Sequence, residues 1–296
     1  MQATRCPLSD GRWHFQHGPI DIVLELDGDA AACRDALGRT WQRFETVLPE
    51  LVSELPLLRR PVANLRPHDF HGEVARTMCL AAHEMAWVAT EGFVTPMAAV
   101  AGAVAQSLLP YLAQEGVQRA YVNNGGDIAL HLRPGQNWRV GLVSDLQQAL
   151  HSGVASELIV DGSFVIHHDM PVRGVATSGW RGRSFSLGIA DSVTVLADTA
   201  AQADVAATLI ANAVNIAHSS IRRQAANSLR DDSDLGDRLV TRDVPRLPPA
   251  LVEHALQLGL DCAVAMQTRG QVFAAFLCCQ SQMVVAQPLE CLVCLH

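Results

Sequence analysis

Lysine is absent from this 296-residue sequence, because all 22 basic residues are arginine. The absence excludes enzymes that form a Schiff base through lysine, pyridoxal phosphate enzymes among them, and P-loop proteins whose lysine binds phosphate. A bound anion must therefore meet arginine, backbone amides or a metal ion.

Long apolar runs and a secretory signal are absent as well. No stretch is long and apolar enough to span a bilayer, and the first residues, MQATRCPLSDGRWHF, lack a basic region followed by an apolar one. We therefore expect a cytoplasmic protein with eight reduced cysteines rather than a disulfide framework. The tail CLVCLH holds Cys291, Cys294 and His296, for which a zinc site and core packing are the two interpretations; the apolar residues between them favour packing.

The sequence also has no excess of positive charge. The 22 basic residues face 30 acidic ones, for a net charge of −8, and no basic run occurs. This balance argues against a nucleic-acid or anionic-membrane partner. We expect a small-molecule ligand, and the apolar strands near both ends favour a homodimer.

The order of elements predicts an α+β fold, with largely antiparallel sheets and packed Ala-rich helices. No linker or repeat divides the chain, so we predict a single domain over residues 1–296, with core motifs in 95–214. No G-x-G-x-x-G follows a strand, which argues against a dinucleotide fold. The patterns predict a hairpin over 12–26 and helices over 30–57, 69–90, 95–116, 199–217 and 249–258. They also predict a polar surface connection over 219–249. Strands are predicted over 120–123, 128–132, 139–144, 157–160, 164–167, 191–198, 261–267, 271–277 and 282–287.

The stretch YVNNGGDIAL, residues 121–130, runs from one predicted strand into the next. Asn-Gly between apolar runs is a strong hairpin signal. Two glycines followed by Asp127 also leave bare backbone amides beside a carboxylate, which suits a flat ring, a phosphate or a hydrated metal ion. The sequence leaves both interpretations open.

The helix predicted over 199–217 carries a carboxylate in apolar surroundings. Thr199 and Gln202 fit a capping box, so Asp204 lies one turn inside the helix, with Thr208 and Asn212 continuing its face. One interpretation is that Asp204 only meets the positive end of its own helix dipole. The other is a hard-ligand site, for which carboxylate and hydroxyl oxygens favour Mg²⁺.

The stretch GVATSGWRGRSFSLG, residues 174–188, supplies hydroxyls and two arginines. Arg181 and Arg183 are forked donors suited to phosphate or carboxylate. A plain loop with solvated arginines is the alternative.

Four segments in order, MAAVAGAVAQ, YVNNGGDIAL, VATSGWRGRSFSLGIADSVTVLAD and AQADVAATLIANAV, resemble the ApbE-like superfamily, most closely its UPF0280 branch. The resemblance runs from about Thr95 to Val214 and implies an ApbE-like fold with a pocket between sheet and helices. ApbE proteins are FAD:protein FMN transferases that use Mg²⁺ to cleave FAD and attach FMN to a threonine of a partner protein. UPF0280-type proteins resemble products associated with tetrahydromethanopterin-linked one-carbon metabolism, which makes a flavin or a pterin the expected ligand.

Residue by residue, the resemblance carries the metal-binding role to Ala101, Asp204 and Thr208. It carries the flavin-lining loop to Gly125, Gly126 and Asp127. Two departures count against FMN transfer: the lysine of the family's AKG segment is Gly102 here, and SFSLGIAD replaces a segment with catalytic His and Asp.

Three functions remain open. The first is a Mg²⁺-dependent, transferase-like enzyme that handles a cofactor, with Asp127 as general base. The second is a non-catalytic flavin- or pterin-binding protein, and the third is a metal-free structural subunit. The residues expected to bind the ligand are Asn123, Asn124, Gly125, Gly126, Thr177, Ser178, Gly179 and Arg181.

Overall fold

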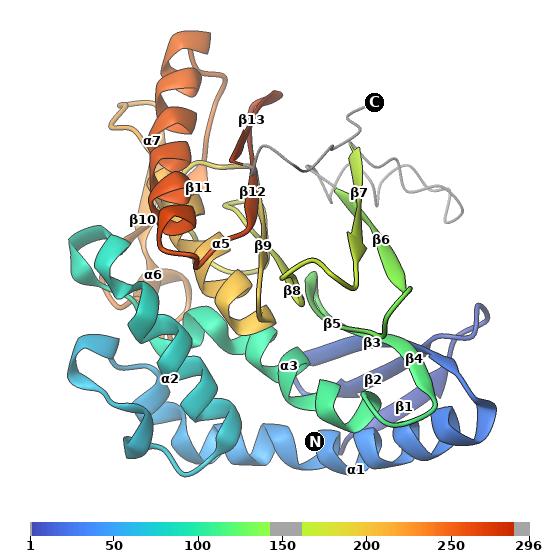
Figure 1. The fold of residues 1–296 in the computed structure, drawn as a ribbon. Coiled ribbons are helices and arrows are strands. Elements are labelled where there is room, and N and C mark those ends of the chain that lie inside the picture. Colours follow the sequence, from blue (N-terminus) through green and yellow to red (C-terminus); the bar gives the residue numbers. More distant parts are fainter. Residues whose placement is uncertain (1, 143–161, 287–296) are drawn as a thin grey trace.

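The computed structural model describes residues 2–142 and 162–286 (Figure 1). Nine strands form one sheet in the order β1-β2-β3-β4-β5-β8-β9-β12-β13, and every neighbouring pair is antiparallel. These strands are β1 (Thr4–Pro7), β2 (Trp13–His17), β3 (Ile20–Gly28), β4 (Val117–Asn124), β5 (Asp127–Leu132), β8 (Gly174–Ser178), β9 (Ser192–Ala197), β12 (Ala274–Cys279) and β13 (Gln282–Ala286). Two small antiparallel hairpins stand beside this sheet: β6 (Asn137–Leu142) with β7 (Gly162–His167), and β10 (Arg222–Ala225) with β11 (Leu239–Asp243).

The long helices pack on one face of the large sheet (Figure 1). Helix α1 lies against β3, α3 against β4 and β5, α5 against β8 and β9, and α7 against β12. The helices are α1 (Ala30–Leu58), α2 (Glu73–Met85), α3 (Val100–Leu112), α5 (Ala200–Ala213), the short α6 (Ala226–Leu229) and α7 (Pro249–Thr268), with single 3₁₀ turns η1 (Val62–Asn64), η2 (Pro67–Asp69), η3 (Ala86–Val88), η4 (Thr90–Gly92) and η5 (Pro96–Ala99).

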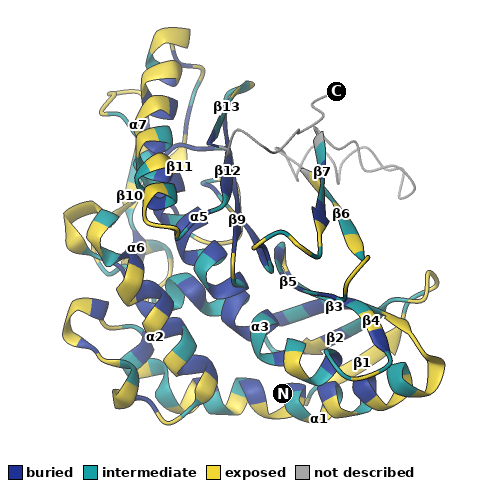
Figure 2. Ribbon diagram, viewed as in Figure 1, coloured by how far each residue is buried: buried dark blue, intermediate teal, exposed yellow. Residues whose placement is uncertain are grey.

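Apolar residues alternate along the strands and so serve two separate cores. The larger core lies between the sheet and the helices, where α5 is buried along most of its length (Figure 2). The smaller core lies on the other face, beneath the β6–β7 hairpin, and Phe164 of β7 stacks on Phe276 of β12 with ring centroids 5.6 Å apart. Successive side chains of a strand point to opposite faces, so one strand contributes to both cores.

The predicted α+β class is confirmed, with Ala-rich α3 and α5 packed on an antiparallel sheet. The hairpin predicted over 12–26 and the helix predicted over 30–57 are confirmed as β2–β3 and α1. The strand predicted over 157–160 lies outside the described residues.

Two expectations in the C-terminal part need correction. The strand predicted over 261–267 is wrong, because α7 continues through those residues to Thr268. Its residues Val252, Ala255, Leu256, Gly259, Ala263 and Met266 are buried at helical spacing, and this face extends the helix. The polar connection over 219–249 contains the β10–β11 hairpin and α6 rather than an unstructured excursion.

Thr95 precedes η5, but its hydroxyl donates to Asp234 at 2.5 Å instead of capping the helix.

No helix in the described part of the chain combines the length and apolarity needed to cross a bilayer.

Candidate functional site

The two glycines of the central motif form a tight hairpin turn between β4 and β5. Asn124 and Asp127 pair across the strands, and Gly125 and Gly126 both have positive φ, 68° and 114°. These angles are the ones that primed two-residue turns require, and glycine adopts them without strain. The hairpin interpretation is therefore confirmed.

The two residues that flank this turn direct their polar groups toward the helices. The Asn124 amide donates to the carbonyl oxygen of Ala101 at 3.1 Å, and Asn124 and Asp127 are only 6% and 9% exposed. The side chain of Asn123 accepts the Gly126 N–H at 2.8 Å and so stabilises the turn itself. A Cβ at Gly126 would meet nothing within 4 Å, so open space adjoins the turn there.

Asp204 of α5 contacts the same part of α3 as Asn124 does. The Thr199 hydroxyl caps α5 by accepting the Gln202 N–H, as expected. Asp204 accepts the Gly102 N–H at 2.9 Å and also interacts with the Ala101 N–H. Because α3 begins at Val100 without a capping side chain of its own, Asp204 caps α3 from a neighbouring helix. The positive helix end that it meets is that of α3, not of its own helix.

Asp127 and Asp204 are close enough to disfavour each other's charge. Burial raises the pKa of Asp127 to about 7, against the lowering effects of the Thr177 N–H and the Arg183 guanidinium. Burial, followed by the negative charge of Asp127, raises the pKa of Asp204, and the N–H groups of Gly102 and Ala101 oppose this. Two partly desolvated carboxyls beside one another resist simultaneous ionisation, and a cation between them would relieve this cost.

Gly102 stands where the resemblance places a lysine, and the packing leaves no space there for a side chain. A Cβ at Gly102 would collide with the carbonyl group of Ala200. The absence of lysine at this position is therefore part of how α3 and α5 pack.

The segment after β8 approaches the turn at two residues. The Thr177 N–H donates to Asp127 at 3.2 Å, while the Thr177 hydroxyl pairs with that of Thr194 at 2.8 Å. Ser178 is the last residue of β8 and pairs with Val193. At Gly179 the chain runs against the carbonyl of Asp191, where a Cβ would collide.

The two arginines of this segment have different surroundings. Arg181 forms an ion pair with Asp191 at 2.8 Å and lies over the Trp180 ring. Arg183 lies against Gly125, where a Cβ would collide with its guanidinium, and its charge acts on Asp127. The structure thus adds Arg183 to the turn, whereas the ligand-binding role expected for Arg181 stays a prediction.

Thr208 lies one helical turn beyond Asp204 and is half-buried. On the next turn, Asn212 accepts the Leu187 N–H at 2.9 Å, so this face of α5 runs from the hairpin turn toward residues 186–188.

The metal-binding roles of Ala101, Asp204 and Thr208 stay predictions. The described residues contain no group of three or more His, Cys, Asp or Glu side chains that could hold a metal ion. The tail residues Cys291, Cys294 and His296 lie outside the described part.

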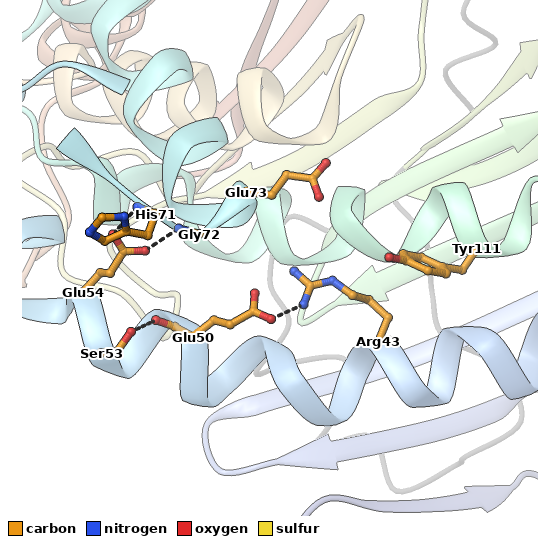
Figure 3. A pocket seen from close by; sticks show the side chains of 8 residues that line it. All are labelled: Arg43, Glu50, Ser53, Glu54, His71, Gly72, Glu73 and Tyr111. Atoms are coloured by element: carbon orange, nitrogen blue, oxygen red, sulfur yellow. Dashed lines mark hydrogen bonds and ion pairs between the residues drawn. The ribbon is translucent and has the colours of Figure 1, made fainter. Parts of the chain in front are cut away.

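A separate hollow of about 450 Å³ lies between α1, the start of α2 and α3 (Figure 3). None of the residues predicted from the sequence lines it; its lining is Arg43, Glu50, Ser53, Glu54, His71, Gly72, Glu73 and Tyr111.

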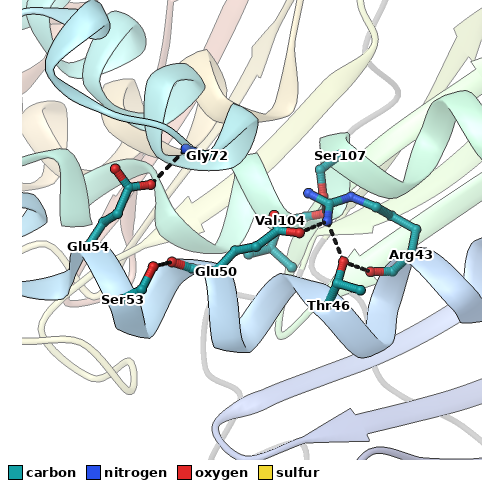
Figure 4. A network of polar contacts seen from close by, with 8 residues as sticks. All are labelled: Arg43, Thr46, Glu50, Ser53, Glu54, Gly72, Val104 and Ser107. Atoms are coloured by element: carbon teal, nitrogen blue, oxygen red, sulfur yellow. Dashed lines mark hydrogen bonds and ion pairs between the residues drawn. The ribbon is translucent and has the colours of Figure 1, made fainter.

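The polar groups of this hollow largely satisfy one another (Figure 4). Arg43 donates to Glu50 and Thr46, at 2.6 Å each, and Glu54 accepts the N–H groups of His71 and Gly72, at 2.8 Å each. Glu54 thereby caps α2, so this network holds helices together.

A family model described as "AbpE bacteria" matches residues 4–285. A UPF0280 protein of Methanothermobacter thermautotrophicus is 39% identical over 200 residues, which cover 67% of this chain and 63% of that protein. A UPF0280 protein of Methanopyrus kandleri is 35% identical over 193 residues, covering 65% of this chain and 69% of that protein. The chain belongs to the UPF0280 family.

Solved structures of flavin transferases show a loose likeness to this UPF0280 chain. The apo flavinyl transferase ApbE of Pseudomonas stutzeri has a TM-score of 0.46 at 12% identity, with 97% of this chain and 94% of that chain covered. The flavin transferase ApbE of Vibrio cholerae has a TM-score of 0.46 at 13% identity, with 97% of each chain covered.

Proposed function

We propose that this UPF0280 protein handles a cofactor, binding a flavin- or pterin-like ring at the β4–β5 turn beside Asp127 and Asp204. The observation that carries the proposal is the meeting of two carboxyls with raised pKa at a two-glycine turn. Carboxyl groups are costly in such places unless they are paired or meet a cation or a ligand. The open space beside Gly126 leaves room for a ring next to the turn.

The oxygen groups near the turn fit a magnesium ion. Asp204 and Asp127 supply carboxylates, and Ala101 supplies a carbonyl oxygen already turned toward Asn124. Mg²⁺ in proteins is commonly held by one or two carboxylates with waters and ligand oxygens completing the shell. When bound, the ion would neutralise the two acids and polarise a phosphate oxygen of the ligand.

Asp127 is the proposed general base. Its pKa of about 7 lets it accept and release a proton near neutral pH, which is the range in which general bases act well. Arg183, lying over the turn, would contact an anionic group of the ligand by paired N–H donors. A pterin, a flavin or a phosphorylated precursor of either fits these groups, and the tetrahydromethanopterin link of UPF0280-type proteins favours a pterin.

The alternative is a non-catalytic binding protein. It is favoured by the loss of two features expected for FMN transfer, the lysine at Gly102 and the His-Asp segment. The protein purified without added ligand should release a flavin or pterin detectable by mass spectrometry. Conversion of FAD to FMN with Mg²⁺ would support the enzyme, and bound ligand without conversion of FAD would support the binder.

The proposed binding of Mg²⁺ at the turn has a separate test. We expect Mg²⁺ to raise the melting temperature of the wild type, because a ligand at about a hundred times its Kd stabilises by about 2.7 kcal/mol. The Asp204→Asn and Asp127→Asn variants should lose this shift, whereas Asp237→Asn, at an exposed site, should keep it. An equal Mg²⁺ shift in all four proteins would contradict metal binding at the turn.

A further inference from the structure

Cys6 of β1, His14 of β2 and Asp21 of β3 share the sheet face opposite α1; His14 lies directly opposite Cys6, and Asp21 lies diagonally across from His14. Their strand neighbours Phe15 and Ile22 are fully buried on the α1 side, so these three side chains point to the other face. Cys6 pairs with His14 in the strand register, with Sγ 4.0 Å from Nδ1. The other ring nitrogen, Nε2, is 2.9 Å from Asp21 Oδ1.

We propose that Cys6 is a covalent modification site, a thiol that His14 and Asp21 activate for exchange with low-molecular-weight disulfides. The spacing is that of a nucleophile, a base and a carboxylate that orients the base. With Nε2–H donated to Asp21, Nδ1 is the acceptor and faces the thiol. Asp21 also stabilises the imidazolium that forms when His14 takes the thiol proton.

Exposure distinguishes Cys6 from the other cysteines in residues 2–142 and 162–286. Cys6 is exposed, whereas Cys79, Cys278 and Cys279 are buried and Cys33 and Cys262 are half-buried. Burial raises the pKa of Cys79 and Cys262 to about 11 and that of Cys279 to about 12, which suppresses their thiolates. Burial, then the charges of Asp27 and Asp29, raises the pKa of Cys33.

Other polar groups near this face have partners of their own. Tyr121 of β4 interacts with Arg12 and with Glu25, and Arg12 also pairs with Asp10. Cys6 lies on an edge strand whose four residues are all exposed, so a small disulfide reaches the sulfur without any opening of the fold (Figure 2).

The proposed exchange needs no oxidant other than the small disulfide itself. The Cys6 proton passes to His14, the thiolate attacks one sulfur of the disulfide, and the disulfide bond breaks as the Cys6 mixed disulfide forms. The departing thiolate takes the proton from His14 and leaves as a free thiol. One disulfide and one thiol therefore give one mixed disulfide and one thiol.

The test uses the full-length protein with oxidised glutathione as probe, and peptide mass spectrometry to follow each cysteine. At pH 7 we expect Cys6 to be modified about ten times faster than Cys33, in line with its greater exposure and base. His14→Gln should slow modification of Cys6 about tenfold and Asp21→Asn should slow it severalfold, since the base is lost or misoriented. Gln16→Asn, on the same face of β2, is the matched control and should change nothing.

The pH dependence separates activation from exposure. The wild-type rate at Cys6 should depend less steeply on pH than the rate of His14→Gln, because only the wild type has a base beside the thiol. Melting curves check that each variant is folded; if His14→Gln does not fold, the rate and pH profile of Asp21→Asn decide. Equal rates at Cys6 and Cys33, or a Cys6 rate and pH profile unchanged in the variants, would overturn the proposal.

Discussion

Asp127 shows how one residue can be unfavourable for stability and useful for chemistry. Its carboxyl is almost fully buried, with one N–H donor from Thr177 at 3.2 Å and the charge of Arg183 nearby. Neither compensates for the lost water, so the neutral form is favoured and the pKa rises to about 7. Residues with strongly shifted pKa values are concentrated at functional sites.

The raised pKa predicts how stability depends on pH. An acid whose pKa is higher in the folded state contributes stability that is fully present below its unfolded pKa and is lost as the pH rises through 7. In EDTA at pH 8, Asp127→Asn should therefore be more stable than the wild type by about 2 kcal/mol in urea unfolding.

This difference should shrink toward pH 5, where Asp127 is protonated in the folded protein. Asp237→Asn, at an exposed position, serves as the control. A difference that is equal at pH 5 and pH 8 would contradict the raised pKa.

Two helices start without a capping side chain of their own and are capped from neighbouring helices. Asp204 of α5 accepts N–H groups at the start of α3, and Glu54 of α1 accepts those of His71 and Gly72 before α2. Each carboxylate also stands at the positive end of the capped helix. These contacts join neighbouring helices and also provide acceptors for the N–H groups at the start of each capped helix.

The α2 cap gives a prediction at the scale of this helix. Glu54→Ala should lower the free energy of unfolding by about 1–2 kcal/mol, because two N–H groups lose their acceptor. Amide hydrogen exchange should accelerate in the first turn of α2. Glu45→Ala, at an exposed position on the same helix α1, should have little effect on either measurement; equal losses in the two variants would rule out the cap.

The whole molecule places one large sheet between two cores, and the smaller core holds the β6–β7 hairpin. Phe164 and Phe276 join that hairpin to β12 by stacking at 5.6 Å. Within residues 2–142 and 162–286 the hairpin shares no strand pairing with the large sheet, so it depends on this core more than on backbone bonds to that sheet.

Removing one of these rings should loosen the hairpin selectively. Phe164→Ala should cost about 3 kcal/mol of stability, as large-to-small core substitutions do, and should speed amide exchange in β6 and β7. Exchange in α5, which belongs to the larger core, should change far less. Met283→Ala, at an exposed position of β13, is the control; exchange that rises equally in α5 and the hairpin would show that the two cores unfold together.

The elements that the sequence predicts correctly are those with local signals. Alternating apolar residues placed β2–β3, the pair Gly125-Gly126 placed the β4–β5 turn, and Thr199 placed the start of α5. Each of these depends on backbone preference or on spacing within a few residues. The order of four motifs also predicted the UPF0280 family.

Which distant groups meet depends on the fold of the whole chain. The strand predicted over 261–267 is helical because Ala263 and Met266 are buried as part of α7, which packs on β12, and no short window of sequence shows that surface. Asp204 was singled out as an acid in an apolar helix, yet its position at the start of α3 depends on how α3 and α5 pack at Gly102. The ion pair of Arg181 with Asp191 and the position of Arg183 against Gly125 likewise depend on the fold, because residues distant in the sequence meet only in the folded chain.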